Sequence, residues 1–80
     1  MTISDAVVRR ILELCDERSL TINGISNIAG VTQSTVSDII NQKTNNAGVS
    51  TLKKLCDGFG ITIRAFFDSP IFDNLEQEVK

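Results

Sequence analysis

The feature that most constrains the fold is a single glycine, Gly30, between two short stretches of helical periodicity at residues 21–29 and 32–41. Apolar residues recur every three or four positions in both stretches, which predicts two amphipathic helices. Only two residues separate them, so the chain must turn sharply. Glycine adopts a left-handed backbone without steric cost, and we expect Gly30 to end the first helix in that conformation. The sequence therefore predicts two helices joined by a tight turn.

Each of these predicted helices is preceded by a threonine. A threonine oxygen at the N-cap accepts a hydrogen bond from a free backbone amide, so Thr21 and Thr32 are expected to cap them. The residues expected on the apolar sides are Ile22, Ile25, Ile28 and Ala29 in the first helix, Val36, Ile39 and Ile40 in the second, and Val31 between them.

This two-helix unit resembles the helix-turn-helix of the Cro and C1 repressor family, also called the XRE family. Five positions carry the resemblance: the small residue Ser26, the turn glycine Gly30, and the apolar residues Val31, Val36 and Ile39. The resemblance extends roughly from residue 11 to residue 67. It implies an all-α fold, a compact five-helix DNA-binding domain of the lambda repressor-like type.

Three further helices are expected around the two-helix unit. The first, at residues 1–18, should be capped by Ser4, and the fourth should follow a cap at Ser50. The fifth, with the sequence IRAFF, should begin after Thr62. The residues expected in the core are Val7, Ile11, Leu14 and Cys15 in the first helix and Leu52, Leu55, Cys56 and Phe59 in the fourth. Residues 1–68 are thus expected to form one helix-turn-helix domain.

Residues 69–80 are expected to form an acidic and apolar tail. A Ser-Pro pair near its start can open a helical turn, and Ile71, Leu75 and Val79 recur every four residues. Two interpretations stay open. The tail is either frayed and held by Ile71 and Phe72, or it forms a sixth helix at a dimer interface.

The beginning of the second helix of the motif is the expected reading surface. The major groove of B-DNA admits one α-helix, and its base edges carry distinct donor and acceptor patterns. Gln33 can pair with the N6 and N7 atoms of adenine, while Ser34 and Ser37 can bond to a base edge or a phosphate. In an arbitrary protein these residues would form an ordinary solvated face. The motif around them favours base reading.

Five residues are expected to contact DNA phosphates: Thr32, Thr35, Asn41, Lys43 and Thr44. Asp38 is given no role. The resemblance implies the contacts of Asn41, Lys43 and Thr44 at the end of the recognition helix. Donors held on helix ends fix the register of a protein on DNA without reading its sequence. A carboxylate such as Asp38 repels phosphates, although it can accept a hydrogen bond from cytosine.

The chain departs from the family pattern at three places. Many relatives have a buried ion pair between the first and third helices, where this chain has Cys15 and Ile40. Replacing both partners of such a pair by apolar residues is often neutral, so we expect an intact fold with Cys15 packed near Ile40. Ile22 replaces a frequent phosphate-binding glutamine. Ser19 replaces a frequent glycine, which predicts a strained turn.

The charge distribution bears on the expected partner. The net charge is −2, but residues 68–80 alone contribute −3, from four acids and one base, which leaves +1 for the other 67 residues. Non-specific DNA affinity should be weak, because it depends on the number of phosphates neutralised. We expect a homodimer on a two-fold operator, acting as a repressor, because a single helix covers few base pairs. The alternative is an antitoxin-like or other protein-interaction module that keeps the fold.

Several other classes are disfavoured by composition. The chain has no histidine, no metal-ligand spacing and no nucleophile beside a base, so neither an enzyme nor a metal or cofactor site is expected. No small-molecule ligand, membrane span or signal peptide is expected. Cys15 and Cys56 lie in apolar patterns and should be reduced, buried thiols of a cytoplasmic prophage-type regulator.

Overall fold

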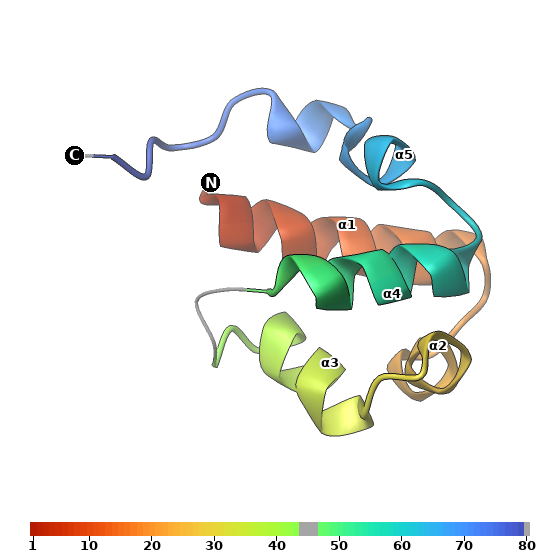
Figure 1. Cartoon of the computed structure of the whole chain (residues 1–80). Coiled ribbons are helices and arrows are strands. Elements are labelled where there is room, and N and C mark those ends of the chain that lie inside the picture. Colours follow the sequence, from red (N-terminus) through yellow and green to blue (C-terminus); the bar gives the residue numbers. More distant parts are fainter. Residues whose placement is uncertain (44–46, 80) are drawn as a thin grey trace.

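The computed structural model describes residues 1–43 and 47–79 and contains five α-helices and one 3-10 turn (Figure 1). The helices are α1 (Ile3–Glu17), α2 (Ile22–Ala29), α3 (Gln33–Ile40), α4 (Val49–Phe59) and α5 (Ile63–Phe67), and the 3-10 turn η1 is Pro70–Phe72. No strand occurs among the described residues. The expected all-α, five-helix fold is confirmed.

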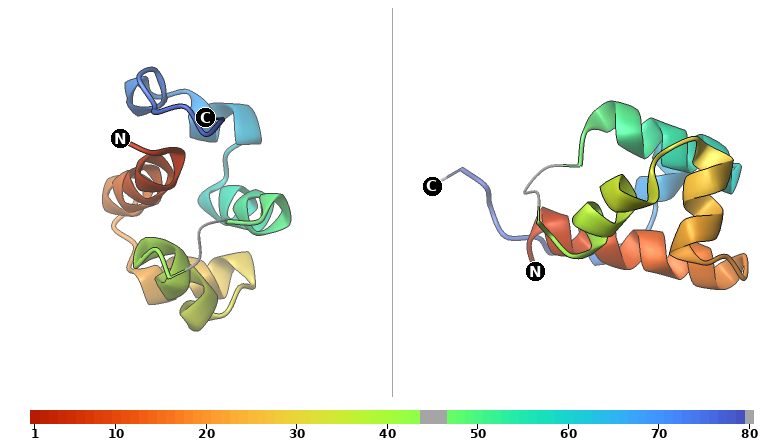
Figure 2. Two further views of the ribbon diagram at one scale, coloured as in Figure 1. Left: turned by 90° about the vertical axis from the view of Figure 1, so that its left-hand side faces the viewer. Right: turned by 90° about the horizontal axis from the view of Figure 1, so that it is seen from below.

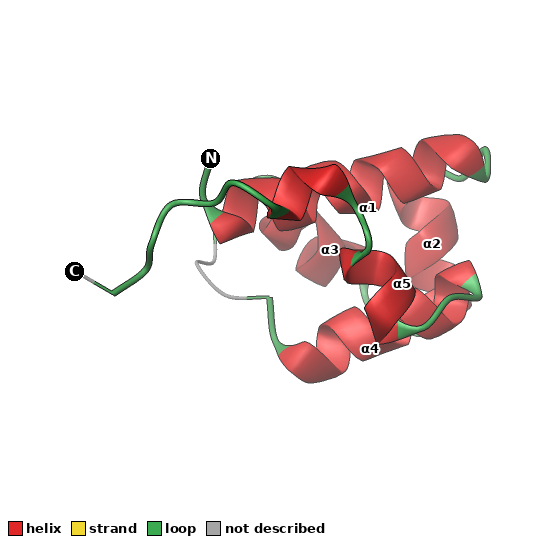
Figure 3. Cartoon of the chain, turned by 90° about the horizontal axis from the view of Figure 1, so that it is seen from above, coloured by secondary structure: helices red, strands yellow, loops and turns green. Residues whose placement is uncertain are grey.

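The helices form three layers. α1 and α4 lie side by side in the middle, with α5 and η1 on one side of them and α2 and α3 on the other (Figures 1 and 2). Seen from above, α5 crosses α4 and η1 lies over α1 (Figure 3). α2 packs on both α3 and α4, so the two-helix unit is held against the middle layer.

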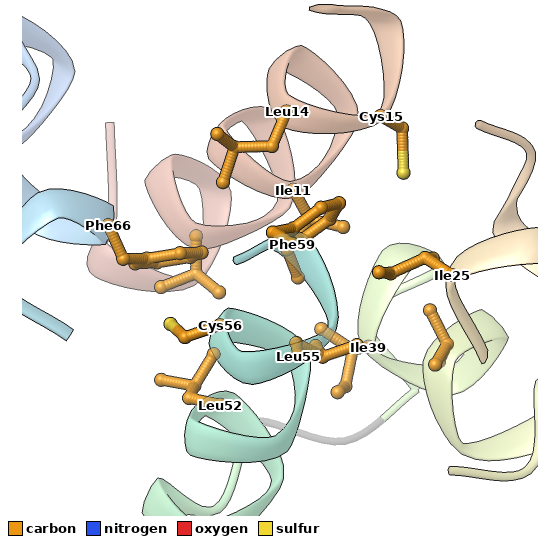
Figure 4. Close-up of a cluster of buried hydrophobic side chains, with 12 residues drawn as sticks. Ile11, Leu14, Cys15, Ile25, Ile39, Leu52, Leu55, Cys56, Phe59 and Phe66 are labelled. Atoms are coloured by element: carbon orange, nitrogen blue, oxygen red, sulfur yellow. The ribbon is translucent and has the colours of Figure 1, made fainter. Parts of the chain in front are cut away.

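The core lies where these layers meet and draws side chains from all five helices. Ile11, Ile25, Leu55 and Phe66 have no exposed surface, and Phe66 points from α5 into the space between α1 and α4 (Figure 4). All eight residues expected in the core from the first and fourth helices are buried. Burying a large apolar side chain contributes about 1.5–3 kcal/mol, so this shared core holds the orientation of α2 and α3.

The signals at Gly30, Thr21, Thr32 and Thr62 act as expected, and Gly60 provides a further left-handed helix end. Gly30 and Gly60 end α2 and α4 in the left-handed conformation, with φ of 70° and 76°. The hydroxyls of Thr21, Thr32 and Thr62 each accept a hydrogen bond from the backbone amide three residues on. These caps satisfy amides that the first turn of a helix leaves unpaired.

Two expected caps are wrong. α1 is capped by Thr2 rather than Ser4, because Thr2 and Asp5 form a reciprocal capping box with both bonds at 3.1 Å. α4 begins at Val49 after Gly48, so Ser50 lies inside its first turn. Gly48 provides no side-chain bond, but its carbonyl accepts the first helical bond, from the Leu52 amide at 3.0 Å.

The expected apolar side of α2 is wrong at one position. Ile28 is 58% exposed, whereas Ile25 is fully buried and Ile22 and Ala29 are half-buried against the core. Successive residues are about 100° apart around a helix, so Ile22, Ser26 and Ala29 lie on one side of Ile25 and Ile28 lies on the other, outside the buried stripe. Ser26 lies at the opposite edge of the buried stripe from Ile28, and its buried hydroxyl donates to the Ile22 carbonyl at 2.7 Å.

The departures from the family pattern are accommodated. Cys15 is buried and Ile40 is half-buried against the core, while the direct contact between them stays a prediction. The strained turn expected at Ser19 is confirmed, because this non-glycine residue has a left-handed φ of 52°. Such a conformation costs an L-residue about 1–2 kcal/mol.

Arg10 in α1 and Arg18, the C-cap residue of α1, reach the carboxyl ends of distant helices. Arg10 donates from Nε to the Phe66 carbonyl at 2.7 Å and from Nη2 to the Ala65 carbonyl at 2.9 Å, and it also pairs with Glu13. Arg18 donates to the Phe59 carbonyl at 3.0 Å. Positive groups are favourable beside carbonyls that a helix end leaves unpaired. Together these contacts tie α4 and α5 to α1.

In its described part, residues 69–79, the tail forms one 3-10 turn and no α-helix. Pro70 opens the turn, and Phe72 packs its ring 4.9 Å from the ring of Phe67, measured between centroids. Beyond it the Glu76 amide donates to the Met1 carbonyl at 3.1 Å, and Val79 is 85% exposed. The four-residue repeat therefore does not mark a helix. The last described residues extend away from the body of the domain (Figure 1).

Candidate nucleic-acid interface

The turn between α2 and α3 sets the direction of α3. Gly30 supplies the left-handed residue, and the Val31 amide then donates to the Ser26 carbonyl at 3.0 Å. This pairing of a left-handed residue with a bond back across the turn is a common way to end a helix. Val31 is half-buried against the core, so the turn is fixed both by hydrogen bonds and by packing.

The first turn of α3 presents polar side chains to solvent. Thr32, Gln33, Ser34 and Thr35 are exposed, and Ser37 is half-buried one turn further on. The opposite side of the same helix carries Val36 and Ile39, which are buried in the core. Packing thus holds the helix by one side and leaves the other free to meet a ligand. All three expected base-reading residues lie on or beside this polar face.

The polar side chains at this helix start differ in their bonding. The Thr32 hydroxyl accepts from the Thr35 amide at 3.2 Å, and its oxygen lies 2.8 Å from the Thr35 hydroxyl and 3.3 Å from the Ser34 hydroxyl. Gln33 makes no side-chain hydrogen bond to any described residue, although its amide has two donors and an acceptor. On this turn, Gln33 is therefore the side chain whose bonding groups are not used by any of the described residues.

The far end of α3 places the expected phosphate-binding groups. Asn41 is the C-cap and is exposed, and Lys43 is exposed two residues later. The backbone between them is fixed, because the Lys43 amide donates to the Asp38 carbonyl at 2.9 Å. Thr44 lies outside the described residues. Asp38 is exposed on the same helix, so one carboxylate accompanies these donors.

Sequence reasoning missed one contact at this end of α3. Gln42 has a left-handed φ of 53°, and its side-chain Nε2 donates to Asp5 Oδ1 at 2.8 Å. The Gln42 amide is the main cause of a lowered pKa at the Asp5 carboxyl, followed by bonds from the backbone and hydroxyl of Thr2. The partners are 37 residues apart, and no local pattern in either segment signals the pairing.

The described residues contain no cluster of three histidine, cysteine or acidic side chains that could hold a metal ion. Cys15 and Cys56 are buried free thiols, and burial raises the pKa of each. A raised pKa keeps a thiol protonated and unreactive, which does not suit a nucleophile. Within the same residues, no helix has the length and apolar character needed to span a bilayer.

Comparison with known proteins gives two findings. A family model of the Cro/C1-type HTH DNA-binding domain matches residues 10–68. The fold is similar to the crystal structure of the prophage Lp1 protein 11, with a TM-score of 0.82 and 31% sequence identity over 94% of this chain and 99% of that one. No curated protein matches the sequence.

Proposed function

The chain belongs to the Cro/C1-type helix-turn-helix DNA-binding domain family, and we propose that it is a sequence-specific transcriptional regulator that reads the major groove with α3. The observation that carries this proposal is the state of Gln33. Its amide is exposed on the first turn of a helix whose opposite side is buried, and it has no bonding partner among the described residues. Such a group can make a bidentate contact with adenine.

The neighbouring residues divide into two roles in this proposal. Ser34 and Ser37 read base edges beside Gln33, while the remaining hydroxyls and amides contact phosphates. Thr32 and Thr35 take the second role in this proposal, and their exposure at the positive end of α3 supports it. Asn41, Lys43 and Thr44 complete the phosphate contacts at its other end. The phosphate contacts fix the register that lets base contacts discriminate.

We propose further that the protein acts as a homodimer on a two-fold operator and represses transcription. One α3 helix spans few base pairs, and two helices on half-sites one turn apart multiply the discrimination. The similarity to a prophage protein supports a phage-type regulator. The proposal includes no catalytic activity and no cofactor.

The test separates base reading from phosphate binding. Gln33→Ala should weaken binding to the preferred duplex by roughly 1–3 kcal/mol and relax the preference at one position of each half-site. Lys43→Ala should weaken all duplexes alike and lower the salt slope by about one unit per site. The matched controls are Gln77→Ala and Lys54→Ala, which change exposed residues away from α3. Labelled duplexes, first selected from a random pool, are titrated at several salt concentrations.

A second candidate function is a protein-interaction module, and the net charge of −2 is the observation that favours it. Excess negative charge opposes association with DNA. A wild-type protein that binds no duplex in a salt-dependent manner would favour the interaction module over the regulator. If Gln33→Ala left the ranking of duplexes unchanged in a protein that does bind, α3 would not be the reading helix proposed here.

A further inference from the structure

We propose that Gln42 and Asp5 are positioning residues, which fix the chain where it leaves α3 and so hold Lys43 in place to bind a DNA phosphate. The inference rests on the proposed DNA-binding function and adds to it two residues that need not touch DNA. It joins the end of the recognition helix to the first turn of α1, two segments that are far apart in the sequence.

The first observation is the conformation of Gln42. Its φ of 53° lies in the left-handed region, which L-residues adopt at a conformational cost that glycine avoids. The backbone there is closed by two bonds, from the Gln42 amide to the Ile39 carbonyl at 3.1 Å and from the Lys43 amide to the Asp38 carbonyl at 2.9 Å. A glycine would suit this turn better. Because glutamine lacks the backbone freedom of glycine, its side chain must contribute to holding this turn.

That contribution is the bond to Asp5. Gln42 Nε2 donates to Asp5 Oδ1 at 2.8 Å, and the second carboxylate oxygen, Oδ2, accepts from the Thr2 amide at 3.1 Å. The Asp5 amide in turn donates to the Thr2 hydroxyl at 3.1 Å. The acceptor that holds Gln42 is therefore itself held by both bonds of a capping box. Its geometry comes from α1, the longest helix of the domain.

The consequence falls on the next residue. Lys43 is exposed and its side chain makes no hydrogen bond or ion pair with the described residues, so the backbone of Gln42 and Lys43 largely sets its direction. A lysine side chain is long and flexible, and it binds phosphate most effectively when the backbone that carries it is fixed. The Gln42–Asp5 bond limits the backbone freedom of this segment before DNA arrives, which lowers the ordering cost of binding.

The decisive variant is Gln42→Gly. It keeps a left-handed turn that glycine adopts freely and removes the side chain that reaches Asp5. The thermal midpoint should not fall, whereas duplex affinity should drop by about threefold to tenfold and the salt slope should fall towards that of Lys43→Ala. The matched control Gln77→Gly, in the exposed tail, should leave both affinity and slope unchanged. A residue with a purely structural role would change the melting midpoint and leave the salt slope intact.

Two further comparisons complete the test. In the double variant Gln42→Gly/Lys43→Ala, affinity should be within about twofold of Lys43→Ala alone, because Gln42 acts through Lys43. Asp5→Ala, assayed where melting shows it folded, should weaken binding, although removing a negative charge by itself favours DNA. The control Asp16→Ala removes an exposed charge of the same helix and should leave affinity equal or higher.

The outcomes separate this inference from the function beneath it. A wild-type protein with no salt-dependent duplex binding overturns both. If the wild type binds and Lys43→Ala lowers the slope, but Gln42→Gly binds like the wild type, only the positioning role fails. Full additivity of Gln42→Gly with Lys43→Ala, or tighter binding by Asp5→Ala to the extent seen for Asp16→Ala, likewise overturns it.

Discussion

Replacing Arg10 by methionine is expected to destabilise the domain strongly, although Arg10 lies outside the apolar core. Its side chain is only 12% exposed, and its guanidinium donates to the carbonyls of Ala65 and Phe66 at the carboxyl end of α5. Methionine keeps most of the apolar stem and removes all the donors. Arg10→Met therefore removes the contacts by which α1 holds α5, while most of the packing stays.

The magnitude follows from the number and type of these bonds. A hydrogen bond to a charged group contributes about 1.5–3 kcal/mol, and two such bonds would give about 3–6 kcal/mol. Water can reach part of the vacated space at the helix end, so we expect a loss of about 2–4 kcal/mol in the free energy of unfolding. A domain of this length is stable by roughly 4–12 kcal/mol, so the loss is a large fraction of the total.

Urea denaturation followed by circular dichroism measures this loss, and thermal melting gives a second readout. The midpoint should fall by at least about 8 °C, since each kcal/mol moves it by about 4–8 °C in a domain of 60–100 residues. The matched control is Arg9→Met, which makes the same change at the exposed neighbouring position of α1. Glu13→Gln removes the ion pair but keeps both carbonyl bonds, and it should cost less than about 1 kcal/mol.

The reasoning is refuted if Arg10→Met and Arg9→Met differ by less than about 1 kcal/mol, because two charged hydrogen bonds cannot be worth so little. It is also refuted if Glu13→Gln is as damaging as Arg10→Met. In that case the ion pair, and not the bonds to α5, would be the stabilising contact.

Three further predictions follow from local geometry. Gly30→Ala should lower the free energy of unfolding by about 1–2 kcal/mol in urea titration, because φ is 70° while the space around the glycine is open; unchanged stability would contradict this. Burial raises the pKa of Cys15 and Cys56 above the ordinary 9.0. The contribution of each thiol to folded-state stability is therefore fully present below pH 9.0 and is lost as the pH rises through the raised pKa. Alkylation at pH 8 should be much slower in folded than in urea-unfolded protein, and equal rates would contradict burial. The pKa of Asp5 is lowered from 3.8, so its contribution to stability is present above pH 3.8 and is lost as pH falls through the lower folded value. Asp5→Ala should lack this loss of stability in an acid titration of unfolding, and identical acid titrations of the two proteins would contradict this.

Much of the fold can be predicted from the sequence because the signals that begin and end its helices are local. Thr21, Thr32 and Thr62 cap their helices, and Gly30 ends α2, through bonds and conformations confined to a few residues. The resemblance to the Cro/C1 family, carried by five residues of the helix-turn-helix, implied the fold class. The positions of Gln33 and the other expected reading residues on the exposed side of α3 follow from the same periodicity.

The errors come from choices that several nearby residues could make equally well. Ser4 and Ser50 are both good caps, yet Thr2 and Gly48 hold those positions. Ile28 fits the helical period within the tolerance of the pattern, and only the placement of α2 on α4 decides that it faces solvent. Periodicity gives the existence of an apolar side but not its centre, which depends on the partner helix.

Sequence alone thus determined the helices, their turns and the polar face of α3, since these depend on interactions within about four residues. The tertiary structure alone decided which distant groups meet: Arg10 with the end of α5, and Gln42 with Asp5. Polar side chains such as these are compatible with a solvated surface at every step of a local analysis. Their partners are 37 to 56 residues away, and only the packing of the apolar core brings them within bonding distance.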